Sequence, residues 1–463
     1  MLRRMVRASD DPAEFCYVVV CMQESLSYHR SLLKIGLPIV IGQLGVIVLS
    51  LADTLMLGHY RTVDLAAASF VNNFFNLAII FATGFSYGLT PIVGRLAGEG
   101  KQPSIGGMLK HALLANGLVA LLLTFVMGLC YLNLARFGQP EELLPLIRPY
   151  YAELLASLLF VMLFNAFKQF ADGILDTLTP MFILLGGNLL NIVGNWLLIY
   201  GRCGLPEMGL VGAGLSTLLS RILMCLFFAW LFLGTRRYAV YREGFRSSHF
   251  CGEDFKQLNR LGWPVALQMG METASFSLTA ILVGWMGVVA LAAHQVMLSV
   301  SQLGYMIYYG LAAAVAVQVS QYKGKRDVMG IRRSAQAGMQ LIGVVAILLS
   351  LSLLSCRHLL GTWFTDNPEV SGLVAQLVIP FVVYQFGDGL QCTYSNALRG
   401  ISDVKCVTYY AFIAYFLISL PAAYLFGFTC AGGLVGLWYS FPLGLTSAGL
   451  MFYFRFRKHS GML

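Results

Sequence analysis

Charged side chains are scarce in this chain. Only 11% of its 463 residues are charged and 58% are hydrophobic, with a mean hydropathy of +0.72. Ordinary soluble domains carry about a quarter charged residues. This composition excludes a soluble globular protein and indicates an integral membrane protein.

Catalytic and metal-binding motifs are also missing. The ten cysteines form no CxxC pair, the seven histidines are scattered, and no HExxH, P-loop, GxGxxG or GxSxG pattern occurs. We therefore expect neither an enzyme nor an ATP-driven pump, and no cofactor. The net charge of +9 lies in short clusters between apolar runs, so we expect no nucleic acid partner.

Apolar runs of about 20 residues, the length that crosses a hydrocarbon layer of about 30 Å as a helix, recur along the chain. The sequence predicts an all-α polytopic membrane protein with twelve transmembrane helices. The expected spans are Leu32–Leu57, Leu65–Leu89, His111–Leu134, Leu146–Phe170, Pro180–Tyr200, Gly209–Leu233, Leu261–Met286, Leu291–Val319, Ala335–Leu354, Leu373–Leu398, Cys406–Phe428 and Leu434–Phe454.

The positions of Lys and Arg predict the orientation. Most of the 31 basic residues, Lys168 and Arg399 among them, fall in segments that face the cytoplasm if both termini do, and Arg221 lies within a span. The expected organisation is a cytoplasmic tail (1–31), an N-lobe (32–235), a cytoplasmic linker (236–257), a C-lobe (258–455) and a second cytoplasmic tail (456–463). We treat residues 1–21 as part of the first tail, because their apolar stretch is too short to span.

The two halves of the chain repeat each other in register. Because each half has an even number of spans, both insert in the same orientation and are related by a pseudo-two-fold axis along the membrane normal. Two such lobes around a central cleft suit alternating access to a fixed site. The matching pairs are Lys34–Pro38 with Arg260–Pro264, Gly84 with Gly310, Gly98 with Gly324, and Gly173 with Gly400.

We single out three carboxylates inside predicted spans: Asp53 in the first, Glu272 in the seventh and Asp388 in the tenth. A charge at mid-membrane costs about 2.5–3.5 kcal/mol on an insertion scale. No Lys or Arg lies one helical turn away along the sequence to pair with any of the three. Each is therefore expected to stay protonated, to bind a cation, or to hydrogen-bond a neighbouring helix.

Amides and aromatic residues form further groups within the spans. Asn188, Asn191 and Asn195 lie in the fifth span, with Asn191 and Asn195 on one helix face. They could be cation ligands or bonds between helices. The eighth-span tyrosines at 305, 308 and 309 could hold flat cations in a cleft or form a belt at the membrane surface.

Five short segments carry a family resemblance: Gly36–Pro38, Ala52–Thr54, Gly94–Gly98, Ala171–Gly173 with Pro180, and Asn396–Gly400. In them the chain resembles the multidrug and toxic compound extrusion (MATE) family, most of all its bacterial NorM branch. The similarity extends from Leu32 to Phe454, and we take Gly94–Gly98 as a loop signature.

The resemblance implies a V-shaped cleft and antiport of Na⁺ or H⁺ against amphipathic organic cations. It places the coupling-ion site, which would be a Na⁺ site if Na⁺ is the ion, on Glu272 and Asp388 of the C-lobe. In the N-lobe it implies an ion or substrate site at Asp53, with polar partners Asn191, Asn195 and Thr217. Because Asn195 stands where other branches carry a second carboxylate, we favour the C-lobe as the ion site.

We therefore expect a secondary active antiporter that exports organic compounds, mostly cationic and amphipathic, in exchange for Na⁺ or H⁺. The expected partners are small organic cations, a monovalent cation and membrane lipids. We expect a monomer in the cell inner membrane, with both termini cytoplasmic. The alternative is a flippase of lipid-linked oligosaccharides or lipids, which would need a large cationic cavity; near the spans we find only Arg221 and Lys168.

Overall fold

The computed structural model is almost entirely helical and describes residues 12–138 and 140–461. Within those residues, twelve helical segments are long and apolar enough to cross a membrane, which confirms the predicted number. Residues 1–11 of the expected N-terminal tail lie outside the described part. From Pro12 the backbone is helical and continues without interruption into the first span.

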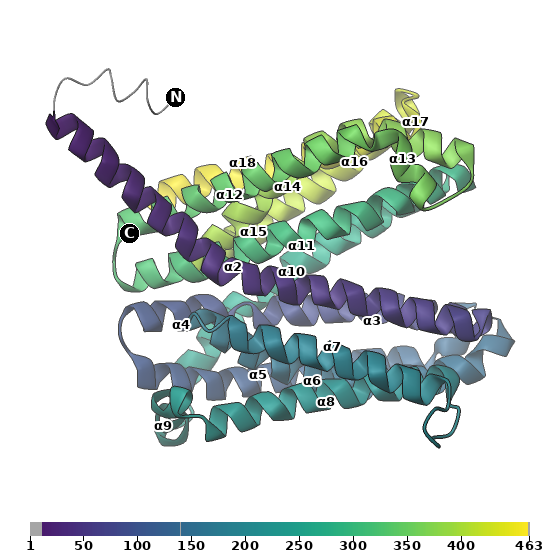
Figure 1. The fold of residues 1–463 in the computed structure, drawn as a ribbon, viewed down its shortest axis with the longest axis horizontal. Coiled ribbons are helices and arrows are strands. Elements are labelled where there is room, and N and C mark those ends of the chain that lie inside the picture. The colour runs from purple at the N-terminus through teal and green to yellow at the C-terminus, as the bar shows by residue number, and fades with distance from the viewer. Residues whose placement is uncertain (1–11, 139, 462–463) are drawn as a thin grey trace.

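Six spans form each lobe. The N-lobe consists of α2 (Pro12–Tyr60), α3 (Thr62–Ser86) with α4 (Leu89–Gly98), α5 (Gln102–Leu132), α6 (Leu144–Gly173), α7 (Leu178–Ile199) and α8 (Gly209–Gly234). The C-lobe consists of α10 (Gly252–Gly284), α11 (Val288–Gly324), α12 (Val328–Ser355), α14 (Pro368–Gly400), the eleventh span beginning at α15 (Val404–Phe412), and α17 (Gly433–Trp438) with α18 (Ser440–His459). The two lobes lie one above the other in Figure 1.

The contacts between helices repeat as the sequence does. In the N-lobe α6 packs against α8, α5 and α3, and α2 packs against α7. In the C-lobe the equivalent α14 packs against α18, α12 and α11, and α10 packs against α15. Between the lobes, α2 contacts α11 and α3 contacts α10, which are again equivalent pairs. The lobes are therefore related by a pseudo-two-fold axis, as predicted.

The lobes meet through glycines whose missing side chains allow close backbone approach. A Cβ added to Gly84 would lie 2.8 Å from the backbone of Ala266, and one added to its repeat equivalent Gly310 would lie 2.9 Å from the backbone of Val40. Gly98 and its equivalent Gly324 face each other: a Cβ on Gly98 would lie 3.1 Å from the Cα of Gly324. The pseudo-two-fold axis passes between these two glycines.

These approaches lie toward one end of the bundle. We call it the terminal end, because α2 begins and α18 ends there, and we call the opposite end the far end. In Figure 1 the terminal end also carries α4 and the short α9 (Ala239–Ser247), whereas α13 (Arg357–Leu360) and α17 lie at the far end. The described glycine contacts between lobes therefore close the terminal end.

The segment Gly94–Gly98, which we expected to be a loop, is helical and forms most of α4. A Cβ on Gly94 would lie 1.8 Å from Ser320 Oγ on α11. The prediction was wrong because glycines suggested a turn, whereas here they allow a helix of one lobe to press against a helix of the other. The second span therefore extends to Gly98 instead of ending near Leu89.

Two π-helical segments, Ile413–Ser419 and Leu425–Thr429, interrupt the eleventh span. Pro421 lies in the short α16 (Leu420–Tyr424) between them and cannot donate a backbone hydrogen bond. Such wide turns are frequent at functional sites. The first of them carries the buried Tyr415, whose hydroxyl accepts a hydrogen bond from Gln391 at 2.9 Å.

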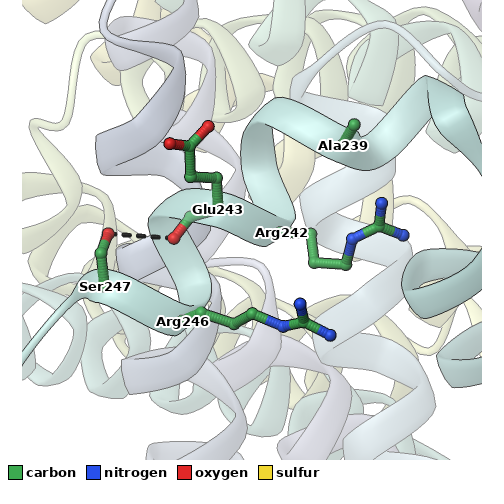
Figure 2. Close-up of a pocket in the computed structure, with 5 residues that line it drawn as sticks. All are labelled: Ala239, Arg242, Glu243, Arg246 and Ser247. Atoms are coloured by element: carbon green, nitrogen blue, oxygen red, sulfur yellow. Dashed lines mark hydrogen bonds between the residues drawn. The ribbon is translucent and has the colours of Figure 1, made fainter.

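The linker between the lobes is folded against the terminal end of the N-lobe. Asp176 accepts hydrogen bonds from Tyr238 OH at 2.5 Å and pairs with Arg237 at 3.0 Å. Burial together with the bond to Asp176 raises the pKa of Tyr238. A surface hollow of about 460 Å³ lies on α9. Figure 2 shows the residues that line it, which are Ala239, Arg242, Glu243, Arg246 and Ser247.

Replacing Gly98 with Ala tests the contact between the lobes. The new Cβ would lie 2.1 Å from the backbone oxygen of Gln321, so we expect the variant to lose about 1–3 kcal/mol of unfolding free energy, as overpacked sites do. Thermal unfolding in detergent measures the loss. Gly117→Ala on α5 is the control, since its Cβ would meet no described atom within 4 Å. Equal stability of both variants would contradict the packing described here.

Candidate functional site

The C-lobe brings together the two carboxylates predicted for it. Glu272 on α10 and Asp388 on α14 interact electrostatically, although 116 positions separate them. Asp388 is only 1% exposed. Glu272 lies within hydrogen-bond reach of Tyr415 and Gln391, and Gln268 Nε2 lies 3.5 Å from its Oε2.

Asp388 has one oxygen without a described partner. Its Oδ1 lies 3.6 Å from Cys392 Sγ, one helical turn along α14. Its Oδ2 is buried and has no hydrogen-bond partner among the described residues. Leaving a buried carboxylate oxygen unsatisfied is costly, so this atom needs a proton or a cation.

Tyrosines surround the two carboxylates. Tyr308 is fully buried, and Tyr384, also buried, accepts a hydrogen bond from Ser301 at 3.1 Å. Tyr305, Tyr308 and Tyr384 interact electrostatically with Asp388. Of the two alternatives left open for the eighth-span tyrosines, their burial excludes the surface belt for Tyr308 and Tyr309.

Arg399 also belongs to this cluster, contrary to our expectation that it lies in a cytoplasmic loop. It is 5% exposed at the end of α14, and its Nη2 donates to Gln268 Oε1 at 2.6 Å. It acts electrostatically on Glu272. Sequence reasoning missed this contact because Gln268 lies on a different helix, 131 positions away in the chain. Lys168, which we counted among the residues that face the cytoplasm, is buried and pairs with Asp172 at 3.1 Å.

The N-lobe brings Asp53 to the predicted amides. Asn195 Nδ2 donates to Asp53 Oδ1 at 2.6 Å, and Asn195 Nδ2 also lies 3.1 Å from Asn191 Oδ1. Asn191 Nδ2 lies 3.1 Å from Thr217 Oγ1 on α8. With its amide oxygen and nitrogen exchanged, Asn191 donates to Asp53 instead, at 3.1 Å, and accepts from Thr217. All four predicted N-lobe residues therefore form one polar chain across α2, α7 and α8.

Two ionisable residues of the N-lobe site were not predicted to belong to it. Arg221, one helical turn beyond Thr217, acts electrostatically on Asp53 and donates to Ser157 Oγ at 2.6 Å. Glu153 on α6 has a buried Oε2 with no partner in the described part of the chain, and a Cβ on Gly214 would lie 1.9 Å from it. Tyr150 interacts electrostatically with both Arg221 and Glu153. Glu153 could have been found as a fourth carboxylate within a predicted span.

A small cavity of about 40 Å³ lies between Asp53 and α3. Its walls are rich in hydroxyl and amide oxygens, which suit a water molecule or a small cation. The lining residues are Ser50, Asp53, Thr54, Leu57, Leu65, Ala68, Ser69 and Asn72.

The two clusters lie at different depths. Asp53 is seven residues before the far end of α2, roughly 10 Å along the helix. Asp388 lies twenty residues into α14 from its far end, roughly 30 Å. Asp53 is therefore nearer the far end than Asp388 is.

Twelve spans in two repeated lobes, each enclosing buried carboxylates, define a polytopic membrane transporter. The MatE family model matches residues 38–197 and 264–425, one segment in each lobe and together more than half of the chain. The chain therefore belongs to the MATE family, whose members are transporters and not enzymes.

Solved structures share this fold. The eukaryotic MATE transporter AtDTX14 is 19% identical, with a TM-score of 0.84 over 95% of this chain and 98% of that one. A MOP superfamily transporter from Pyrococcus furiosus is 19% identical, with a TM-score of 0.85 over 94% and 96%. An outward-facing multidrug resistance MATE transporter is 19% identical, with a TM-score of 0.86 over 94% and 96%.

Replacing Asn195 with Leu tests the support of Asp53. The carboxylate loses its 2.6 Å donor, so we expect about 1–3 kcal/mol less unfolding free energy, measured by thermal unfolding. Asn73→Leu, at an exposed position of α3, is the matched control. If both variants unfold at the wild-type temperature, the Asn195 bond does not support Asp53.

Proposed function

We propose that the chain is a secondary active antiporter of the NorM type, which exports organic cations in exchange for Na⁺ or H⁺. The observation that carries this proposal is the C-lobe cluster, where the buried Oδ2 of Asp388 lacks a partner among the described atoms beside a second carboxylate. Such a pair binds a proton or a small cation reversibly. It is the group that a coupling ion needs.

We further propose a cell inner-membrane location with both termini cytoplasmic. The terminal end then faces the cytoplasm, and the glycine contacts close the lobes on that side. In this outward-facing state the C-lobe carboxylates take up the ion from outside, and the organic cation leaves. Rocking of the lobes then exposes the site inward, where the ion leaves and the substrate binds again.

The N-lobe cluster is our proposed contact for the organic cation. Asp53 lies beside hydroxyl groups of α2 and α3, nearer the far end. Its carboxylate provides the negative charge that a cationic substrate needs. Asn191, Asn195 and Thr217 orient it, and one structural neighbour is described as a multidrug transporter.

Energy from an ion gradient is sufficient for such export. One cation crossing about 100 mV releases about 2.3 kcal/mol. A tenfold ion gradient adds about 1.4 kcal/mol. One-for-one exchange against a monovalent substrate cation moves no net charge, so only the second term then remains.

Replacing Glu272 with Gln or Asp388 with Asn should abolish gradient-driven export, because each change removes a charge on which the ion depends. Efflux of a fluorescent organic cation from cells, corrected for protein level, measures this. Glu253→Gln is the control on the same helix as Glu272, since the Glu253 side chain is 83% exposed. Normal efflux by both site variants would refute the assignment.

Proteoliposomes identify the coupling ion. We expect a fluorescent organic cation to move under an imposed Na⁺ gradient or a pH gradient, and not without one. Movement under one gradient alone names the ion. No movement under either gradient, together with transbilayer movement of a lipid-linked sugar, would establish the flippase alternative instead.

A further inference from the structure

The charged groups of the C-lobe cluster are few enough to count. Described groups that carry charge in their usual forms are Glu272 on α10, with Asp388 and Arg399 on α14. The other titratable groups facing them are neutral in their usual forms: Tyr305, Tyr308 and Tyr309 from α11, Tyr384 and Cys392 from α14, and Tyr415 from the eleventh span. Two carboxylates and one guanidinium leave one negative charge.

Arg399 is held toward Glu272 and not toward Asp388. Its Nη2 donates to Gln268 Oε1 at 2.6 Å, and Gln268 Nε2 reaches Glu272 Oε2 at 3.5 Å. Gln268 and Glu272 are one turn apart on α10, and Gln268 is 1% exposed. A buried amide thus bridges the guanidinium and the carboxylate. Arg399 acts electrostatically on Glu272, and its described hydrogen bonds go to Gln268 and Asn396, not to Asp388.

Asp388 is left as the carboxylate without a counter-charge. Its Oδ2 is buried, and no partner for this atom exists in the described part of the chain. The weak thiol contact from Cys392 at its other oxygen cannot neutralise a carboxylate. The arrangement therefore separates a carboxylate with a permanent cation from one that is open to an exchangeable cation.

We propose that Arg399 is the resident cation of the C-lobe site: it neutralises Glu272 through Gln268, so that the site takes one monovalent cation at a time, at Asp388. This inference rests on the proposed antiport and adds its ion stoichiometry. A second ion is excluded because it would leave the buried cluster with a net positive charge. Arg399 is thus a positioning residue for the ion, not a ligand of it.

Charge-balance variants test this proposal on the purified full-length protein. We expect wild type to bind one ²²Na⁺, or to take up one proton measured with a pH indicator. Arg399→Gln leaves two uncompensated carboxylates, so it should bind the cation at least about tenfold more tightly or bind a second one. Glu272→Gln leaves the cluster neutral and should bind none.

The double variant Arg399→Gln/Glu272→Gln separates a charge role from a structural one. It restores a single negative charge, so we expect one ion bound with wild-type stoichiometry. An arginine that only holds the helices together would not be rescued by removing Glu272. Arg399→Lys keeps the charge and should bind one ion, and Arg457→Gln, at an exposed position of α18, is the control.

The outcomes distinguish this inference from the proposed function. If wild type binds neither ion, the antiport proposal fails. If wild type binds one ion but folded Arg399→Gln binds it with unchanged affinity and number, the resident-cation proposal is overturned. Should Arg399→Gln not fold, the double variant decides: one ion supports the proposal, and none overturns it. Should that variant also fail to fold, loss of binding by Arg399→Lys overturns the proposal.

Discussion

The arrangement of this transporter depends on how closely two helix backbones can approach at the pseudo-two-fold axis. Gly98 and Gly324 meet there without side chains between them, and a Cβ on Gly324 would lie 2.1 Å from the backbone oxygen of Arg95. Such a close backbone contact fixes how the two lobes are aligned with each other at the terminal end. This contact fixes the helices that carry the two carboxylate clusters, and it therefore also sets the positions of those clusters.

Both lobes carry carboxylates and an arginine within the membrane-spanning region, but at different positions in the repeat. Each contains a cluster of two carboxylates and one arginine: Glu272, Asp388 and Arg399 in the C-lobe, and Asp53, Glu153 and Arg221 in the N-lobe. The arginines do not occupy equivalent positions in the repeat. Arg399 aligns with Asp172, next to the matched glycines Gly173 and Gly400. The two halves therefore share their backbone contacts but not the positions of their charged residues.

Sequence reasoning succeeded where the signal is local. Runs of apolar residues located the twelve spans, and the spacing of Asn191 and Asn195 placed them on one face. It failed where a long side chain reaches another helix, as with Arg399 to Gln268 and Arg221 to Ser157. Such a contact cannot be predicted from the spacing of residues along the chain. The pairing of Glu272 with Asp388 was inferred from family resemblance, and their roles remain proposals.

The difference in depth between the clusters has a consequence for how transport is coupled. Asp53 and Asp388 lie in different lobes, and Asp53 is nearer the far end. On the proposed assignment, an ion at Asp388 and a substrate at Asp53 do not compete for the same space. Communication between them must instead pass through rigid-body movement of the lobes. The exchanged species can then differ greatly in size and shape, because neither has to imitate the other.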